Sequence, residues 1–210
     1  MTTAPRTYQS IMVSSTFTDL EEHRAKVIEA IQHHRFYANV MEYSGAAIGP
    51  DVLDKSLAMV AESAAYVLVI GHRYGQCPID PDRNAQERSI TELEFDEAVR
   101  LKLPVLLFVI ADKHPVTKAT GGWETDPTSL AKLEAFIRRA KLADPTNLAS
   151  KVERVWGAFV SHDDFAQRAA IAIGKLAVEF RVREALADEV RRREVTEEER
   201  AGDGYRLNSF

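Results

Sequence analysis

The segment of residues 89–98, SITELEFDEA, carries the side chains of this sequence that are best suited to chemistry. Ser89 and Glu92 have the spacing of a helix-capping box, which gives Glu92 a structural role. At about 100° of rotation per helical residue, Glu94 shares the apolar face of the helix with Ile90 and Ala98. A carboxylate in that position could stabilise an oxocarbenium-like centre during cleavage of a glycosidic bond, or attack it as a nucleophile.

A structural ion pair explains Glu94 equally well. Arg24 is the candidate partner, because it shares the apolar face of the preceding predicted helix with Leu20 and Ile28. Glu42 has two explanations as well: it could contact a ribose hydroxyl, or it could pair with Arg24. For Glu42 we favour the pair with Arg24.

Small polar residues and glycines follow two of the apolar runs. In a parallel sheet these positions lie beyond the carboxyl ends of the strands, where ligands bind. Arg73 could pair with a phosphate or carboxylate, and Tyr74 could stack on a base. Helix capping by the serines and plain turns at the glycines are the structural alternatives. The predicted substrate-binding residues are Ser14, Ser15, Phe17, Glu42, Gly71, Arg73 and Tyr74.

Several classes of protein lack support in the sequence. It contains neither a Gly-x-Gly-x-x-Gly fingerprint nor a Walker loop, which excludes the usual hydride-transfer and P-loop enzymes. His33 and His34 point in different directions on a helix and Cys77 is the only cysteine, so we expect no metal site and no internal disulfide. The net charge of -5 does not favour direct nucleic-acid binding. The apolar runs are too short to span a membrane, and we expect a cytoplasmic protein.

The elements that must position these residues alternate along the chain as strands and helices. Apolar runs at residues 11–13, 37–41, 65–70, 104–110 and 152–160 predict five strands, the last of them interrupted by charge. Helical periodicity separates them, which predicts a flavodoxin-like or TIR-like α/β fold with a doubly wound parallel sheet. Thr18 and Glu21 predict a capping box for the first helix. Trp123, after two glycines, could be a lid, a subunit contact or a local packing residue.

We expect an α/β domain over residues 7–160, a C-terminal helical extension over 161–200 and a disordered tail over 201–210. The extension reads as one long helix or two, and it ends in a run of charged residues.

Four segments together resemble the bacterial TIR-like domain of unknown function that heads many defence-associated proteins. They are residues 13–20 (VSSTFTDL) with Arg24, Met41 with Glu42, residues 71–75 (GHRYG), and residues 89–94 (SITELE) with Ala98, and they span about the first half of the chain. The family is similar to TIR domains and, more remotely, to nucleoside deoxyribosyltransferases. That resemblance implies that Glu94 is the glutamate that serves cleavage of an N-glycosidic bond. It also implies that residues 44–49 form a loop used in assembly. Residues 90 and 91 are Ile-Thr where TIR enzymes have Trp-Cys.

The resemblance favours an NAD(P)-cleaving or related nucleotide N-glycosidase, an effector of antiphage defence that is activated by oligomerisation. NAD or NADP would be its substrate rather than a cofactor, and its partners would be further copies of the chain or a separate sensor protein. The alternatives are a non-catalytic nucleotide-binding or protein-interaction module and a base-exchange enzyme.

Overall fold

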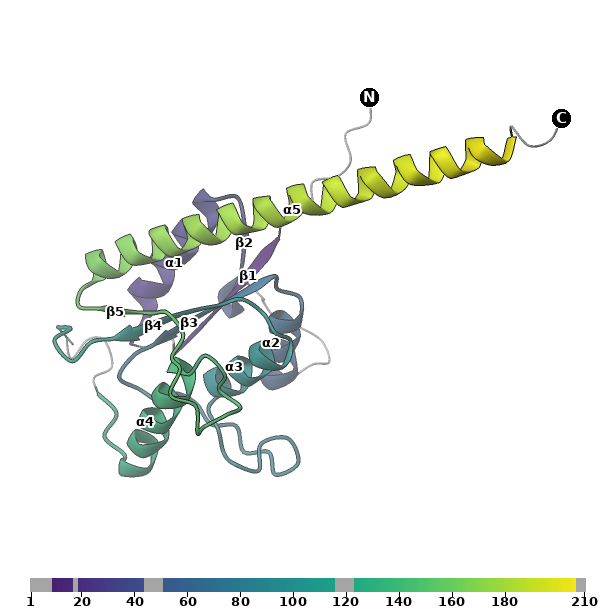
Figure 1. Cartoon of the computed structure of the whole chain (residues 1–210). Coiled ribbons are helices and arrows are strands. Elements are labelled where there is room, and N and C mark those ends of the chain that lie inside the picture. The colour runs from purple at the N-terminus through teal and green to yellow at the C-terminus, as the bar shows by residue number, and fades with distance from the viewer. Residues whose placement is uncertain (1–8, 17–18, 44–50, 116–122, 207–210) are drawn as a thin grey trace. The chain divides into compact units, whose positions relative to one another are not determined.

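The computed structural model describes residues 9–16, 19–43, 51–115 and 123–206, and for residues 195–206 it describes only the backbone. The chain divides into two compact units, Met1–Ala170 and Ile171–Phe210. The boundary falls within one continuous helix, α5 (His162–Arg206), which extends into the segment predicted as a tail (Figure 1). None of the described helices is long and apolar enough to cross a membrane.

A five-stranded parallel sheet forms the centre of the first unit, with the strand order β2-β1-β3-β4-β5. This is the flavodoxin-like order, so the predicted fold class is confirmed. The central strand β3 is buried along its whole length, as its continuous apolar run predicts. The strands are β1 (Ser10–Ser15), β2 (Tyr37–Asn39), β3 (Ala65–Ile70), β4 (Val105–Ile110) and β5 (Trp156–Phe159).

The last strand is shorter than the apolar run that predicted it. β5 begins at Trp156, whereas Val152 and Val155 are 67% and 98% exposed. Between these valines, Glu153 forms an isolated antiparallel bridge with Leu142, and Nε of Arg154 donates to the backbone oxygen of Leu142 at 3.0 Å. The prediction of a strand over residues 152–160 is therefore wrong at its amino-terminal half.

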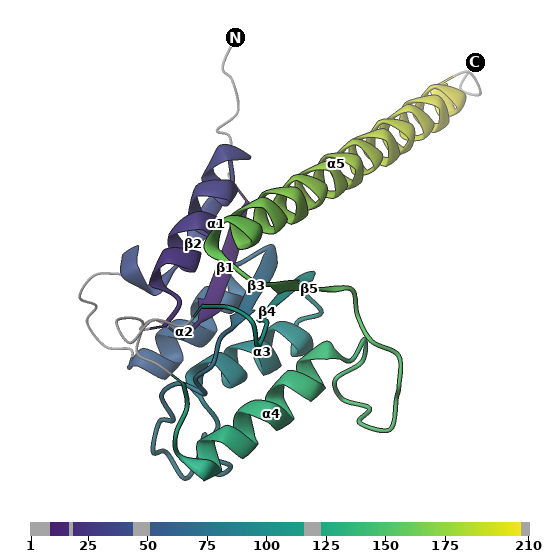
Figure 2. The same cartoon turned by 90° about the vertical axis from the view of Figure 1, so that its left-hand side faces the viewer.

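Helices cover both faces of the sheet (Figures 1 and 2). One face carries α1 and the first turns of α5, where Phe165 packs against Phe108 of β4 at 5.4 Å between ring centroids. The other face carries α2, α3 and α4. The remaining bounds are α1 (Glu21–His33), a short 3-10 helix η1 (Met41–Tyr43), α2 (Val52–Ala61), α3 (Ile90–Arg100) and α4 (Pro127–Lys141).

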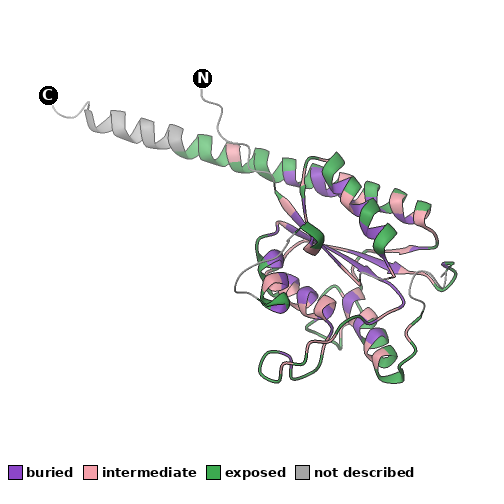
Figure 3. Ribbon diagram, turned by 180° about the vertical axis from the view of Figure 1, so that it is seen from behind, coloured by how far each residue is buried: buried purple, intermediate pink, exposed green. Residues whose placement is uncertain are grey.

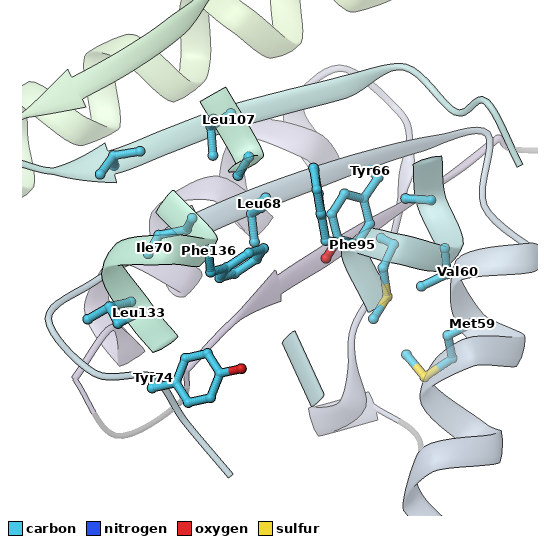
Figure 4. Close-up of a cluster of buried hydrophobic side chains, with 14 residues drawn as sticks. Met59, Val60, Tyr66, Leu68, Ile70, Tyr74, Phe95, Leu107, Leu133 and Phe136 are labelled. Carbon is cyan, nitrogen blue, oxygen red and sulfur yellow. The ribbon is translucent and has the colours of Figure 1, made fainter. Parts of the chain in front are cut away.

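Buried residues of the first unit concentrate on the strands and on the helix faces turned toward them (Figure 3). Between the sheet and α2, α3 and α4 lies one apolar cluster, to which Met59, Leu68, Phe95 and Phe136 contribute (Figure 4). Burying such large side chains is the main stabilising contribution to the fold. The cluster also fixes the position of α3, the helix that carries Glu94.

The amino terminus of α3 begins as the sequence predicted. Ser89 is the N-cap residue, and its side chain accepts a hydrogen bond from the backbone N–H of Glu92. The capping box predicted for α1 is wrong, because that helix begins at Glu21 with Leu20 at its N-cap and no capping hydrogen bond from a side chain. Thr18 itself lies outside the described residues.

Candidate functional site

A cavity of about 550 Å³ lies at the carboxyl ends of β1 and β3. These two strands flank the point where the strand order reverses, which is the usual ligand site of this fold. The volume suits a small molecule or part of a nucleotide. Five of the predicted residues line it together: Ser14, Ser15, Glu42, Arg73 and Glu94.

Glu94 projects from the first turns of α3 into this cavity and is only 5% exposed. Its carboxylate accepts a hydrogen bond from the hydroxyl of Ser14, at the end of β1. Burial raises the pKa of Glu94 to about 7, while the hydroxyl of Ser14, the charge of Arg24 and the hydroxyl of Ser56 act in the opposite direction. A carboxyl group with this pKa exists in both protonation states near neutral pH, which is typical of groups that take part in catalysis.

Arg24 is held by Glu42 in a two-pronged ion pair. Its Nε and Nη2 donate to the two carboxylate oxygens of Glu42, each at 2.7 Å. Nη1 donates to Ser15 Oγ at 2.9 Å. Burial raises the pKa of Glu42, but the hydrogen bonds and charge of Arg24 outweigh it and lower the pKa below its usual value. The predicted pair of Arg24 with Glu42 is confirmed, and the ion pair of Arg24 is therefore with Glu42 instead of Glu94.

The structure does not bring Tyr74 and Gly71 to the cavity wall. Tyr74 is 3% exposed in the apolar cluster of Figure 4, and its hydroxyl donates to Glu92. Its ring is therefore not placed to stack on a base. Gly71 serves close packing, because a Cβ there would lie 2.3 Å from Oδ2 of Asp19. Phe17 and the loop of residues 44–49 lie outside the described residues.

Other residues of the cavity wall were missed from the sequence. Ser56 of α2 is fully buried, and it falls between Val52 and Val60 at intervals of four residues, a helical spacing that could have revealed it. Glu124 follows the Gly-Gly-Trp loop, where no sequence signal pointed to the cavity, and its carboxylate accepts the backbone N–H of Tyr74 at 3.2 Å. Trp123 stacks on His72 with ring centroids 3.7 Å apart, which matches the local-packing alternative.

A separate group of three histidines also lies at the carboxyl edge of the sheet. His23 of α1, His114 after β4 and His162 at the start of α5 have ring nitrogens within 4.8 Å of one another. Burial, together with the charges of His162 and His114, lowers the pKa of His23 to about 3. The sequence by itself points only to the adjacent pair His33 and His34. Residues so far apart in the chain give no local signal, and only the fold brings them together.

The strand order and the cavity at its switch point define a flavodoxin-like α/β domain with a site for a small ligand. A sequence model of a domain of unknown function, DUF4062, matches residues 10–157. The chain belongs to this family. No curated protein matches the chain. One similar solved structure is a diflavin flavoprotein A3 from Nostoc sp., with 15% identity, 85% of this chain and 99% of that chain covered, and a TM-score of 0.41.

Proposed function

We propose that the chain is an N-glycosidase that cleaves NAD(P) or a related nucleotide. The observation that carries this proposal is Glu94, a carboxyl group buried at the wall of the 550 Å³ cavity, with a pKa of about 7 and a hydroxyl partner in Ser14. The resemblance to TIR-like domains, in which a glutamate at this place serves glycosidic cleavage, supports the same assignment.

The reaction breaks the bond between ribose C1′ and the nicotinamide nitrogen. The electron pair leaves with the ring, which is cationic in the substrate and neutral as product, so no acid is needed for its departure. The remaining positive charge lies on the ribosyl group, where ionised Glu94 stabilises it at short range in a site of low polarity. Water then attacks C1′ and releases a proton. Arg73 lines the cavity and is suited to the phosphates.

The first test is release of nicotinamide from NAD, followed by chromatography. We expect wild-type protein to release nicotinamide and Glu94→Gln to lower the rate by at least about 100-fold, because the amide cannot balance the developing charge. Glu97→Gln is the matched control. It makes the same chemical change one turn later on α3, where Glu97 pairs with Arg100 outside the cavity wall.

Circular dichroism must show that Glu94→Gln is folded. A folded Glu94→Gln variant with wild-type activity would overturn the assignment of Glu94. NAD that stays intact under all conditions, including the assembly conditions described next, would overturn the reaction.

We also propose that the enzyme is an effector of antiphage defence that is active only when assembled. A permanently active hydrolase would deplete the cofactor of its own cell. Specific activity should therefore rise with protein concentration or with a crowding agent, in parallel with the mass measured by light scattering. Equal specific activity in a monomer at all concentrations would contradict assembly control without affecting the assignment of Glu94.

A non-catalytic nucleotide-binding or protein-interaction module is the second candidate. It is favoured by the almost complete burial of Glu94 against Ser14, which also suits a purely structural carboxyl group. Calorimetry with NAD distinguishes the two candidates: a binding module retains the nucleotide intact, and its Glu94→Gln variant changes only the affinity.

A further inference from the structure

The three histidines near the sheet edge have no part in the proposed reaction. From their geometry we infer that His23, His114 and His162 form a binding site for a divalent transition metal, with zinc as the best match, and that water occupies the fourth position. This site is distinct from the cavity of Glu94 and does not depend on the proposed enzymatic function.

The spacing of the ligand atoms supports this inference. The Nε2 atoms of His23 and His114 are 3.2 Å apart. Two nitrogens bound to one tetrahedral zinc ion at about 2.0–2.1 Å would lie about 3.3 Å apart. The third ring, His162, places a nitrogen within 4.8 Å of both others. Closing the set to zinc-binding distances requires the partly exposed His162 side chain to move toward the other two rings.

The surroundings of the three rings also suit a metal site. His23 and His114 are 2% and 6% exposed, and Phe159 packs against both of them. The two buried Nε2 atoms face each other across 3.2 Å, and one ion between them would engage both.

The metal site is accessible to solvent on the side of His162. The side chain of His162 is 38% exposed, so an ion can enter from solvent without opening the core. Three imidazole nitrogens with a water molecule are a ligand set that zinc accepts readily, whereas magnesium and calcium prefer sites made entirely of oxygen atoms. A bound ion would join α1, the end of β4 and the start of α5.

The test is metal binding by the full chain, freed of any affinity tag and treated with a chelator. We expect calorimetry to give one zinc ion per chain, and cobalt to give the strong visible absorption of a four-coordinate site. Zinc should also raise the melting temperature in a concentration-dependent manner, because it binds the folded state.

His162→Ala is the variant of choice, because this partly exposed side chain can be removed with little risk to folding. We expect it to weaken zinc binding at least tenfold and to abolish the cobalt spectrum, whereas His162→Cys, which retains a zinc ligand, should restore binding. His33→Ala, at the other end of α1, is the control that retains wild-type affinity.

Two results would overturn the metal site. One is a wild-type chain that binds neither zinc nor cobalt, which would mean that His23 and His114 only share an N–H···N hydrogen bond. The other is a folded His162→Ala variant that binds zinc as tightly as the wild type, which would place the ion elsewhere.

Discussion

Glu94 is governed by two opposing effects at the scale of single residues. Burial favours its neutral form, and the hydrogen bond from Ser14 and the charge of Arg24 favour its ionised form. Arg24 acts on Glu94 through its charge, while its hydrogen bonds go to Glu42 and Ser15. The balance leaves the pKa of Glu94 at about 7, so small changes in its partners should alter the pH dependence of any activity that needs the carboxylate.

Ser14→Ala tests this balance. Without the Ser14 hydroxyl, the ionised form of Glu94 loses a partner and its pKa rises, so activity should decline at a higher pH than in the wild type as the solution is acidified. The measurement is kcat/KM for nicotinamide release against pH, which reports groups of the free enzyme. Ser10→Ala is the control, because Ser10 lies at the opposite end of β1 and donates to the backbone oxygen of Glu62. An unchanged acidic limb in Ser14→Ala would mean that Ser14 does not tune Glu94.

Gly71 matters at the scale of elements, because it lets β3 pass close to the start of α1. A Cβ at position 71 would lie 2.3 Å from Oδ2 of Asp19 and 3.2 Å from the side chain of Leu20. Gly71→Ala should therefore lower the free energy of unfolding by about 2 kcal/mol, measured by urea denaturation. Gly157→Ala is the milder substitution for comparison, since a Cβ at position 157 would lie no closer than 3.2 Å to the side chain of Phe108. A smaller loss in Gly71→Ala than in Gly157→Ala would contradict this packing role.

The hydrophobic pattern and local capping signals predicted an element well where its residues share one environment. The β3 run is apolar throughout because both faces are buried, and Ser89 caps α3 because its side chain meets the Glu92 N–H locally. Before β5, residues 153 and 154 contact Leu142 at the end of α4 instead of pairing with β4, so hydrophobicity alone gave a strand that was too long.

Local sequence could also place Ser14, Glu42 and Glu94 at one sheet edge, because parallel strands align their carboxyl ends. It could not show that Tyr74 turns into the core, since that depends on α3 and α4 packing over it. The partnership of His23, His114 and His162 likewise depends on three elements that only the fold assembles.

At the scale of the whole molecule, the fold buries a carboxyl group that water would otherwise solvate. Ionising Glu94 in the folded chain is costly because desolvation is the largest influence on it. Stability is therefore linked to pH through this residue. Other buried groups also link stability to pH, so the contribution of Glu94 has to be isolated by comparison with a variant that does not titrate.

Glu94→Gln provides that comparison. The pKa of Glu94 is raised from 4.5 to about 7 on folding, so between these pH values the folded chain holds more protons than the unfolded chain. The stabilising effect of the neutral carboxyl is fully present below pH 4.5 and is lost as the pH rises toward 7. Relative to wild type, the free energy of unfolding of Glu94→Gln should increase by about 3 kcal/mol from pH 4.5 to pH 8, as measured by urea denaturation. A constant difference between wild type and Glu94→Gln across this range would mean that Glu94 ionises in the fold as readily as in the unfolded chain.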